Sequence, residues 1–128
     1  MEINQITSVI IKNAIKVHKA LGPGLLESAY KECLAFELLN DGMFIEKEKP
    51  LPLVYKDVRL ECGYRIDLLA EKIVVVEIKS IEALADIHTA QILTYLKLSK
   101  CKIGILINFN VPILKYGIKR YINKFYID

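Results

Sequence analysis

Cysteine is scarce in this sequence, and its three copies form no recognisable motif. Cys33, Cys62 and Cys101 lie far apart without a CxxC pair, so the sequence indicates neither a disulfide framework nor a zinc knuckle. We expect them to be small core residues of a protein in a reduced, cytoplasmic setting. No apolar run reaches the roughly 18 residues of a transmembrane helix, and the N-terminal segment lacks a signal peptide's continuous apolar core.

Several enzyme motifs are missing as well. The sequence has no glycine-rich phosphate loop, no HExxH pair and no Ser-His-Asp set. What it does have is a composition typical of one folded domain, expected to span residues 1–128, with 53% hydrophobic and 26% charged residues. The net charge of +3 is uneven, because residues 97–128 contain seven basic side chains and one acid. This basic end suits either contact with a polyanion or an ordinary solvated surface.

The order of elements predicts an α/β fold. Apolar residues at spacings of three and four predict a first helix, which Gly22-Pro23-Gly24 ends, and a second helix follows. Three strands come next, then a crossover helix and a returning strand, which together predict a mixed central sheet flanked by helices. The predicted helices are 3–21, 25–40 and 86–99, and the predicted strands are 45–55, 58–69, 73–78, 103–109 and 117–122. The first strand carries Pro50 and Pro52 and is expected at a sheet edge.

Glu77 and Lys79 interrupt an otherwise apolar strand, VVVEIKS. Residues two apart in a strand share a face, so these side chains point together, either as a simple ion pair or as part of a site with Asp67. Two carboxylates beside a lysine suit a divalent cation and an activated water. The second interpretation requires an odd connection or a bulge that sets Asp67 on the same face as Glu77, and the sequence leaves that register open.

Asp67 and Glu77-Ile78-Lys79 resemble the D-x(n)-E-x-K motif of the PD-(D/E)xK nuclease superfamily, with Ile66 where the motif's name has proline. The predicted order resembles its restriction-endonuclease-like αβββαβ core. Gly24-Leu25-Leu26-Glu27-Ser28-Ala29-Tyr30 and Ile107-Asn108-Phe109-Asn110 further resemble the bacterial GxxExxY proteins. This resemblance extends over residues 4–122.

The resemblance implies a metal-dependent nuclease, acting on DNA more readily than RNA. By resemblance, Glu27, Asp67 and Glu77 hold Mg²⁺ or Mn²⁺, and Lys79 orients the attacking water. Gln91, with Tyr95 four residues later, matches a pair found in exonuclease-like branches, and Tyr30 is expected either to bond a site carboxylate or to be a core residue.

Other basic residues are candidates for contact with nucleic acid. Arg65 lies two residues before Asp67 and is expected either to meet a phosphate or to pair with Glu61. Lys115, Lys119 and Arg120 are candidates for backbone contacts, which carry no sequence information. The alternative function is a non-catalytic module of the same fold that binds nucleic acid or a protein partner. A homodimer is a further expectation from the small size of the domain.

Overall fold

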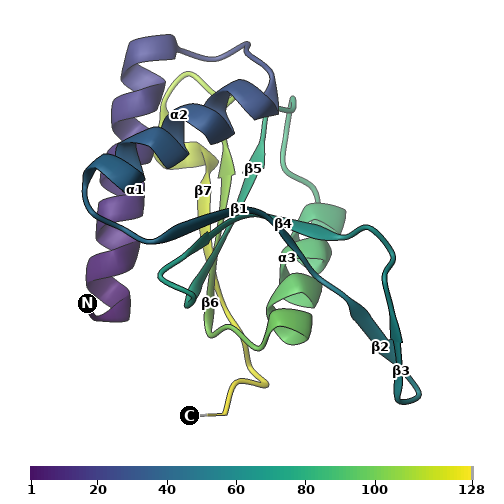
Figure 1. Ribbon diagram of the computed structural model, residues 1–128. Helices are drawn as coiled ribbons and strands as arrows, with labels where there is room; N and C mark the ends of the chain where they lie inside the picture. The colour runs from purple at the N-terminus through teal and green to yellow at the C-terminus, as the bar shows by residue number, and fades with distance from the viewer. Residues whose placement is uncertain (128) are drawn as a thin grey trace.

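The computed structural model describes residues 1–127, and it consists of a mixed sheet with helices on both faces (Figure 1). The helices are α1 (Ile3–Leu21), α2 (Glu27–Asn40), α3 (Asp86–Ser99) and a short 3-10 helix, η1 (Leu114–Gly117). The five-stranded sheet contains β1 (Ile45–Pro50), β4 (Arg65–Ala70), β5 (Val74–Lys79), β6 (Ile103–Asn108) and β7 (Ile118–Ile122). A separate two-stranded ribbon contains β2 (Leu53–Tyr55) and β3 (Val58–Leu60).

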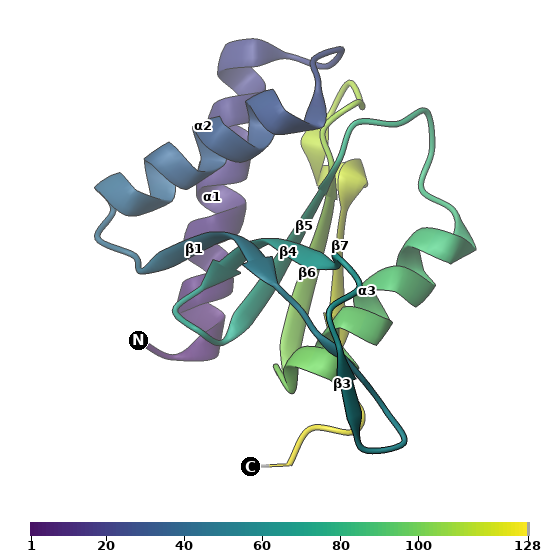
Figure 2. The ribbon, with the colours of Figure 1, turned by 45° about the vertical axis from the view of Figure 1, so that its right-hand side comes forward.

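The sheet order is β1-β4-β5-β6-β7, and only β5 and β6 run parallel. The parallel pair is joined through α3, as a crossover connection requires. Figures 1 and 2 show α1 and α2 on one side of the sheet and α3 on the other. The predicted αβββαβ order and mixed sheet are therefore confirmed, with β1 at a sheet edge. No helix in the described part of the chain is long and apolar enough to cross a membrane.

Strand β5 lies at the centre of the sheet, and its side chains pack into two hydrophobic cores, one on each face. Val74, Val76 and Ile78 pack into the core beneath α1 and α2, whereas Val75 packs into the core beneath α3. This alternation is the period of two that a strand imposes on its side chains. A strand that is apolar on both faces is stable only when helices cover both, so the VVVEIKS segment specifies the middle of this fold.

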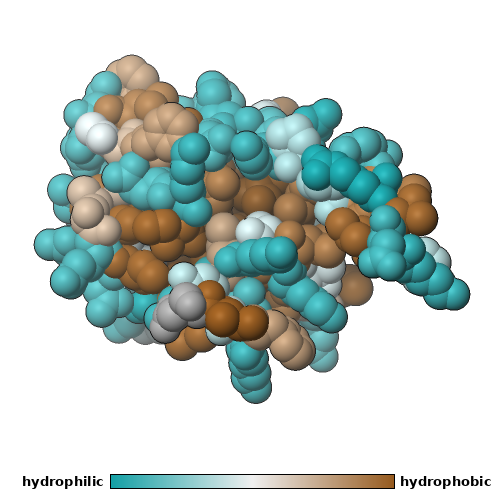
Figure 3. Space-filling model, turned by 60° about the horizontal axis from the view of Figure 1, so that its bottom comes forward, coloured by the Kyte–Doolittle hydropathy of each residue, from teal (hydrophilic) through white to brown (hydrophobic). Residues whose placement is uncertain are grey.

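The predicted strands 45–55 and 58–69 are shorter in the structure than expected. Each divides into a part in the main sheet and a part in the β2–β3 ribbon, which projects from the body in Figure 1 and at the right-hand edge of Figure 3. Leu51 is buried in the α3 core, and Pro52 after it has no amide to continue a ladder. On the returning side, Gly63 has a φ of 79°, which breaks the second strand.

The cysteines follow the core expectation only in part. Cys101 is buried and Cys33 is partly buried, but Cys62 is exposed in the segment between β3 and β4. The expectation was wrong for Cys62. The strand predicted over 58–69 is interrupted after Leu60 in the structure, so Cys62 lies outside both cores.

Asn108 anchors the loop that follows β5. Its side-chain amide donates to the carbonyl oxygen of Ile81 at 3.0 Å and its Oδ1 accepts from the Ile81 amide at 3.1 Å. Oδ1 also accepts from the Asn110 amide at 3.2 Å, and the Asn108 side chain is buried. Because Phe109 also donates from its amide to the Lys79 carbonyl, the ends of β5 and β6 are held together beside Glu77 and Lys79.

We predict that Asn108→Ala lowers the free energy of unfolding by about 1–3 kcal/mol, because the Ile81 amide loses its partner and the Ile81 carbonyl keeps only the longer contact from Asn110. Urea denaturation followed by circular dichroism measures the change. The control is Asn110→Ala, which loses only a 3.3 Å contact to the same carbonyl and is expected to cost less than about 0.5 kcal/mol. Equal losses in the two variants would contradict the anchoring role of Asn108.

Candidate active site

The carboxylates of Asp67 and Glu77 meet where the ladder between β4 and β5 ends. The register pairs Leu68 with Val76 and Ala70 with Val74, so its continuation sets Asp67 opposite Glu77. The connection therefore holds three residues, and Glu71 and Lys72 within it adopt left-handed φ values of 52° and 58°. This is one of the odd connections that the two-carboxylate interpretation requires.

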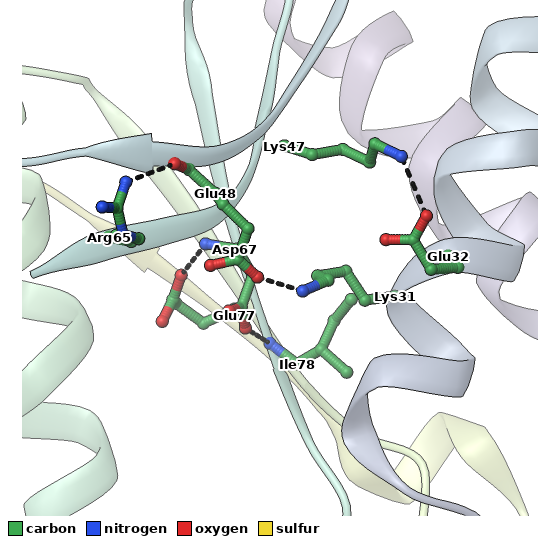
Figure 4. Close-up of polar contacts among 8 residues, drawn as sticks. All are labelled: Lys31, Glu32, Lys47, Glu48, Arg65, Asp67, Glu77 and Ile78. Carbon is green, nitrogen blue, oxygen red and sulfur yellow. Dashed lines mark hydrogen bonds and ion pairs between the residues drawn. The ribbon is translucent and has the colours of Figure 1, made fainter.

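Two bonds between side chains and backbone replace the ladder at this point (Figure 4). The amide of Asp67 donates to Glu77 Oε2 at 2.8 Å, and the amide of Ile78 donates to Asp67 Oδ2 at 2.8 Å. Each carboxylate thus uses one oxygen to bind the opposite strand. Within the described residues, the second oxygen of each carboxylate accepts no hydrogen bond from a protein donor.

Both carboxyl groups are harder to ionise than usual. Burial raises the pKa of Glu77 from 4.5 to about 8, and the negative charge of Asp67 adds to the rise. Burial also raises the pKa of Asp67, although the hydrogen bond from Ile78 opposes it. The Glu77 side chain is only 3% exposed, so water solvates its charge poorly. The arrangement is therefore one that an added positive charge would stabilise.

The predicted residues of α3 lie next to Lys79. Lys79 Nζ donates to Gln91 Oε1 at 2.9 Å, and Gln91 Nε2 donates to Tyr95 Oη at 3.4 Å. Gln91 and Tyr95 are four residues apart on one helix, so their side chains lie on the same face of α3. Lys79 thus makes its side-chain hydrogen bond with Gln91 instead of forming the simple Glu77–Lys79 ion pair that the sequence left open.

A cavity of about 550 Å³ opens on the α2 side of the same strands and contains three acidic residues. It is lined by Asp67, by Glu27 at the first position of α2, and by Glu48 on β1. Lys31 also lines it, and its ammonium group bonds the Glu48 carboxylate (Figure 4). Glu27 therefore shares a cavity with Asp67, as a common metal site requires.

Sequence reasoning missed Glu48 and Lys31. The register of β1 on β4 pairs Lys47 with Leu68 and Lys49 with Ile66, so Glu48 lies opposite Asp67. Glu48 has a φ of 52°, a conformation that is strained for a residue with a side chain. The IEKEKP segment places charges at four of its six positions, and only the pairing with β4 distinguishes Glu48 from the others.

The residues present fit a divalent cation held mainly by two carboxylates. No group of three His, Cys, Asp or Glu side chains within residues 1–127 has the geometry of a complete metal site. Mg²⁺ keeps several waters and usually takes one or two protein carboxylates, so it does not require such a group. The free second oxygens and raised pKa values of Asp67 and Glu77 match that requirement.

Tyr30 does not contact a site carboxylate, so that alternative was wrong. Its hydroxyl donates to the Gly22 carbonyl at 2.6 Å and accepts from the Leu25 amide at 3.1 Å, and its ring stacks on Phe109. Tyr30 is a fully buried core residue, which was the other alternative. It fixes the turn before α2 and so positions Glu27 at the start of that helix.

The basic residues are distributed over different parts of the surface. Arg65 donates to the Glu48 carbonyl at 3.4 Å, and Glu61 pairs with Arg59 instead of with Arg65. Lys115 lies on η1, which follows the end of β6, and Lys119 lies on β7. Arg120 donates to Asn4 on α1 at 3.0 Å, so it lies on the helical face away from α3.

We predict that the metal-free protein loses stability as the pH rises from about 4.5 to about 8. In this window the native state holds the Glu77 proton that the unfolded chain releases, because the native pKa is the higher one. Glu77 contributes at most about 1.4 kcal/mol per pH unit to the slope of the unfolding free energy against pH. Urea denaturation in EDTA across this range measures it.

Glu77→Gln is expected to flatten that dependence, because its amide oxygen can still accept from Asp67 but cannot ionise. The control Glu61→Gln changes an exposed acid and is expected to keep the slope of the unsubstituted protein. A flat profile for the unsubstituted protein, or an unchanged slope in Glu77→Gln, would show that Glu77 ionises normally.

Comparison with known proteins identifies the family. The sequence model of the PD-(D/E)XK nuclease superfamily matches residues 4–121, which is nearly the whole chain. Searches of curated proteins and of solved structures gave no significant match. The matched region includes the sheet, both flanking helical layers and the site at Asp67 and Glu77, and its fold is restriction-endonuclease-like. The chain belongs to the PD-(D/E)XK nuclease superfamily.

Proposed function

We propose that this protein is a metal-dependent nuclease that hydrolyses phosphodiester bonds of nucleic acid, with DNA as the preferred substrate. The observation that carries the proposal is the carboxylate pair of buried Glu77 and half-buried Asp67, which bind each other's strands beside Lys79. The core around these two carboxyl groups is largely apolar. A cation bound between them would stabilise their ionised forms. The family match supports the same chemistry.

Asp67 and Glu77 would hold Mg²⁺ or Mn²⁺ through their free oxygens, and Glu27 would complete the site from α2. A divalent cation, when bound, lowers the pKa of an attacking water and offsets the charge that develops on the phosphate. Glu48 adds a fourth negative charge, which raises the pKa of both Asp67 and Glu77. Lys31 offsets that charge in the metal-free protein through its bond to Glu48.

Lys79 is the proposed catalytic lysine. Its ammonium group is a compact point charge that can hold a phosphate oxygen and orient the water that attacks the phosphorus. Gln91 holds that group in place at 2.9 Å, and Tyr95 in turn bonds Gln91. Gln91 and Tyr95 therefore act as positioning residues for Lys79 in this proposal.

Contacts with the sugar-phosphate backbone are proposed for Arg65, Lys115, Lys119 and Arg120. Such contacts add affinity and salt dependence without recognition of sequence. Arg65 lies beside the acidic cavity, since it donates to the backbone of Glu48, which lines that cavity. The motif of Gly24, Glu27 and Tyr30, whose tyrosine binds the turn before α2, supports the further proposal that the chain belongs to the GxxExxY branch of the superfamily.

A non-catalytic module that binds nucleic acid or a protein partner is the second candidate. The observation that favours it is that residues 1–127 contain no group of three acidic, histidine or cysteine side chains with metal-site geometry. Tight binding of nucleic acid without binding of Mn²⁺ would support this function instead. A homodimer stays a prediction, which light scattering of the purified protein checks.

We predict that the protein cleaves DNA in Mg²⁺ or Mn²⁺, and that Asp67→Asn, Glu77→Gln and Lys79→Ala each reduce the rate at least about 100-fold. Gel assays with matched DNA and RNA strands measure the rate and the preference. Glu61→Gln and Lys12→Ala are surface controls and are expected to keep full activity. Cleavage that survives all three site substitutions would disprove the assigned site, and circular dichroism checks that each variant is folded.

We also predict that Mn²⁺ binding depends on the same carboxylates. Isothermal titration is expected to show one Mn²⁺ bound per chain, with binding abolished in Asp67→Asn and weakened about tenfold in Glu27→Gln. Glu61→Gln again serves as the control. Unchanged affinity in Glu27→Gln would remove that residue from the site, and unchanged affinity in Asp67→Asn would place the cation elsewhere.

A further inference from the structure

A second cavity lies on the α3 side of the site, and its chemistry differs from that of the acidic cavity. It has a volume of about 550 Å³, and Lys79 and Gln91 form part of its wall. The rest of the wall is mainly apolar and aromatic, and it includes Leu53, Tyr64 and Tyr95. Among residues 1–127, none of those that line it is acidic. Of the two cavities at the site, this one is therefore suited to a neutral or anionic group.

A continuous series of contacts leads from Lys79 into this cavity. Lys79 bonds Gln91, Gln91 bonds Tyr95, and the Tyr95 and Tyr64 rings form a T-shaped pair with 6.2 Å between their centroids. Tyr95 is buried, but Tyr64 is 46% exposed. Tyr64 thus has free ring surface next to a rigid partner, and such a surface favours stacking with another flat ring.

We propose that this cavity binds an unpaired base of the substrate, next to the phosphate held by Lys79, and that the nuclease therefore acts on single-stranded or unpaired segments. This inference rests on the proposed nuclease function. A base is a neutral flat ring that a sugar links to a phosphate. A unit of this kind matches an apolar aromatic wall that ends at a lysine. A base within a duplex has both faces stacked, so it has to leave the helix before it can enter the cavity.

The position of Tyr64 supports this assignment. Tyr64 immediately precedes β4, and its carbonyl accepts from the Leu51 amide at 2.8 Å. This bond fixes the backbone at the base of the β2–β3 ribbon, only three residues from Asp67. A base stacked on Tyr64 would therefore lie close to the carboxylates and to Lys79. Stacking on an aromatic side chain tolerates any sequence, because every base has a flat face.

The test measures binding of a short single-stranded DNA containing 2-aminopurine, whose fluorescence falls when the base stacks. Binding is measured in Ca²⁺, and cleavage in Mg²⁺ is measured separately. We expect the single strand to bind more tightly than a blunt duplex of the same sequence and to be quenched. Tyr64→Ala is expected to weaken single-strand binding about tenfold or more and to remove the quenching. Tyr64→Phe is expected to keep both, because stacking needs only the ring.

Two controls keep this test separate from the test of the nuclease function. Phe36→Ala removes an exposed aromatic ring of α2 that does not line this cavity, and is expected to change neither binding nor quenching. Lys79→Ala is expected to weaken binding of all nucleic acids. Cleavage with equal binding of duplex and single strand, unaffected by Tyr64→Ala, would overturn this inference and leave the nuclease function intact.

Other outcomes are equally decisive. If no nucleic acid is bound or cleaved, the nuclease function fails together with this inference. If a free nucleoside binds as tightly as the oligonucleotide, the cavity is a small-molecule site and the inference is overturned.

Discussion

The site depends on two hydrogen bonds that replace the ladder between β4 and β5. A sheet normally pairs backbone amides with backbone carbonyls, but here the amides of Asp67 and Ile78 are bound by the carboxylates of Glu77 and Asp67. This exchange satisfies the backbone while it places two carboxyl groups side by side in a poorly solvated place, which raises the pKa of both. Ionising both carboxyl groups at this point is therefore unfavourable, and a bound cation would offset their repulsion.

The surrounding structure keeps that point rigid from several directions. Asn108 binds the loop after β5 through both polar groups of Ile81, and Phe109 bonds the carbonyl of Lys79. Tyr30, whose ring stacks on Phe109, fixes the turn that precedes Glu27. These groups come from two separate segments of the chain. Their shared effect is that β5 ends in a fixed position, so Lys79 and Glu77 have defined directions.

The sequence predicted the order of the elements and the pairs that depend on local periodicity. Glu77 with Lys79 and Gln91 with Tyr95 follow from the repeat of a strand and of a helix. Features that depend on tertiary pairing were not predictable in this way. Glu48 is one of several charges in β1, and only its position opposite Asp67 distinguishes it. Tyr30 has the same helical spacing whether it bonds a carboxylate or a turn. The strand break at Leu51 depends on which core receives its side chain, and the break at Gly63 depends on a positive φ that the sequence alone does not reveal.

The two cavities beside β4 and β5 divide the site by charge. The α2 side gathers Glu27, Glu48 and Asp67, whereas the α3 side presents Lys79 and aromatic rings without an acid. A phosphodiester is an anion that joins two nucleosides, each of which carries a flat base. The acidic cavity alone would repel the negative charge of the phosphate. A cation among the carboxylates would remove that repulsion, and the α3 side would then receive the adjacent base. The division therefore explains how a site built around the carboxylates of Asp67 and Glu77 can accept a negatively charged substrate, and why Lys79 lies on the wall of the second cavity instead of pairing with Glu77.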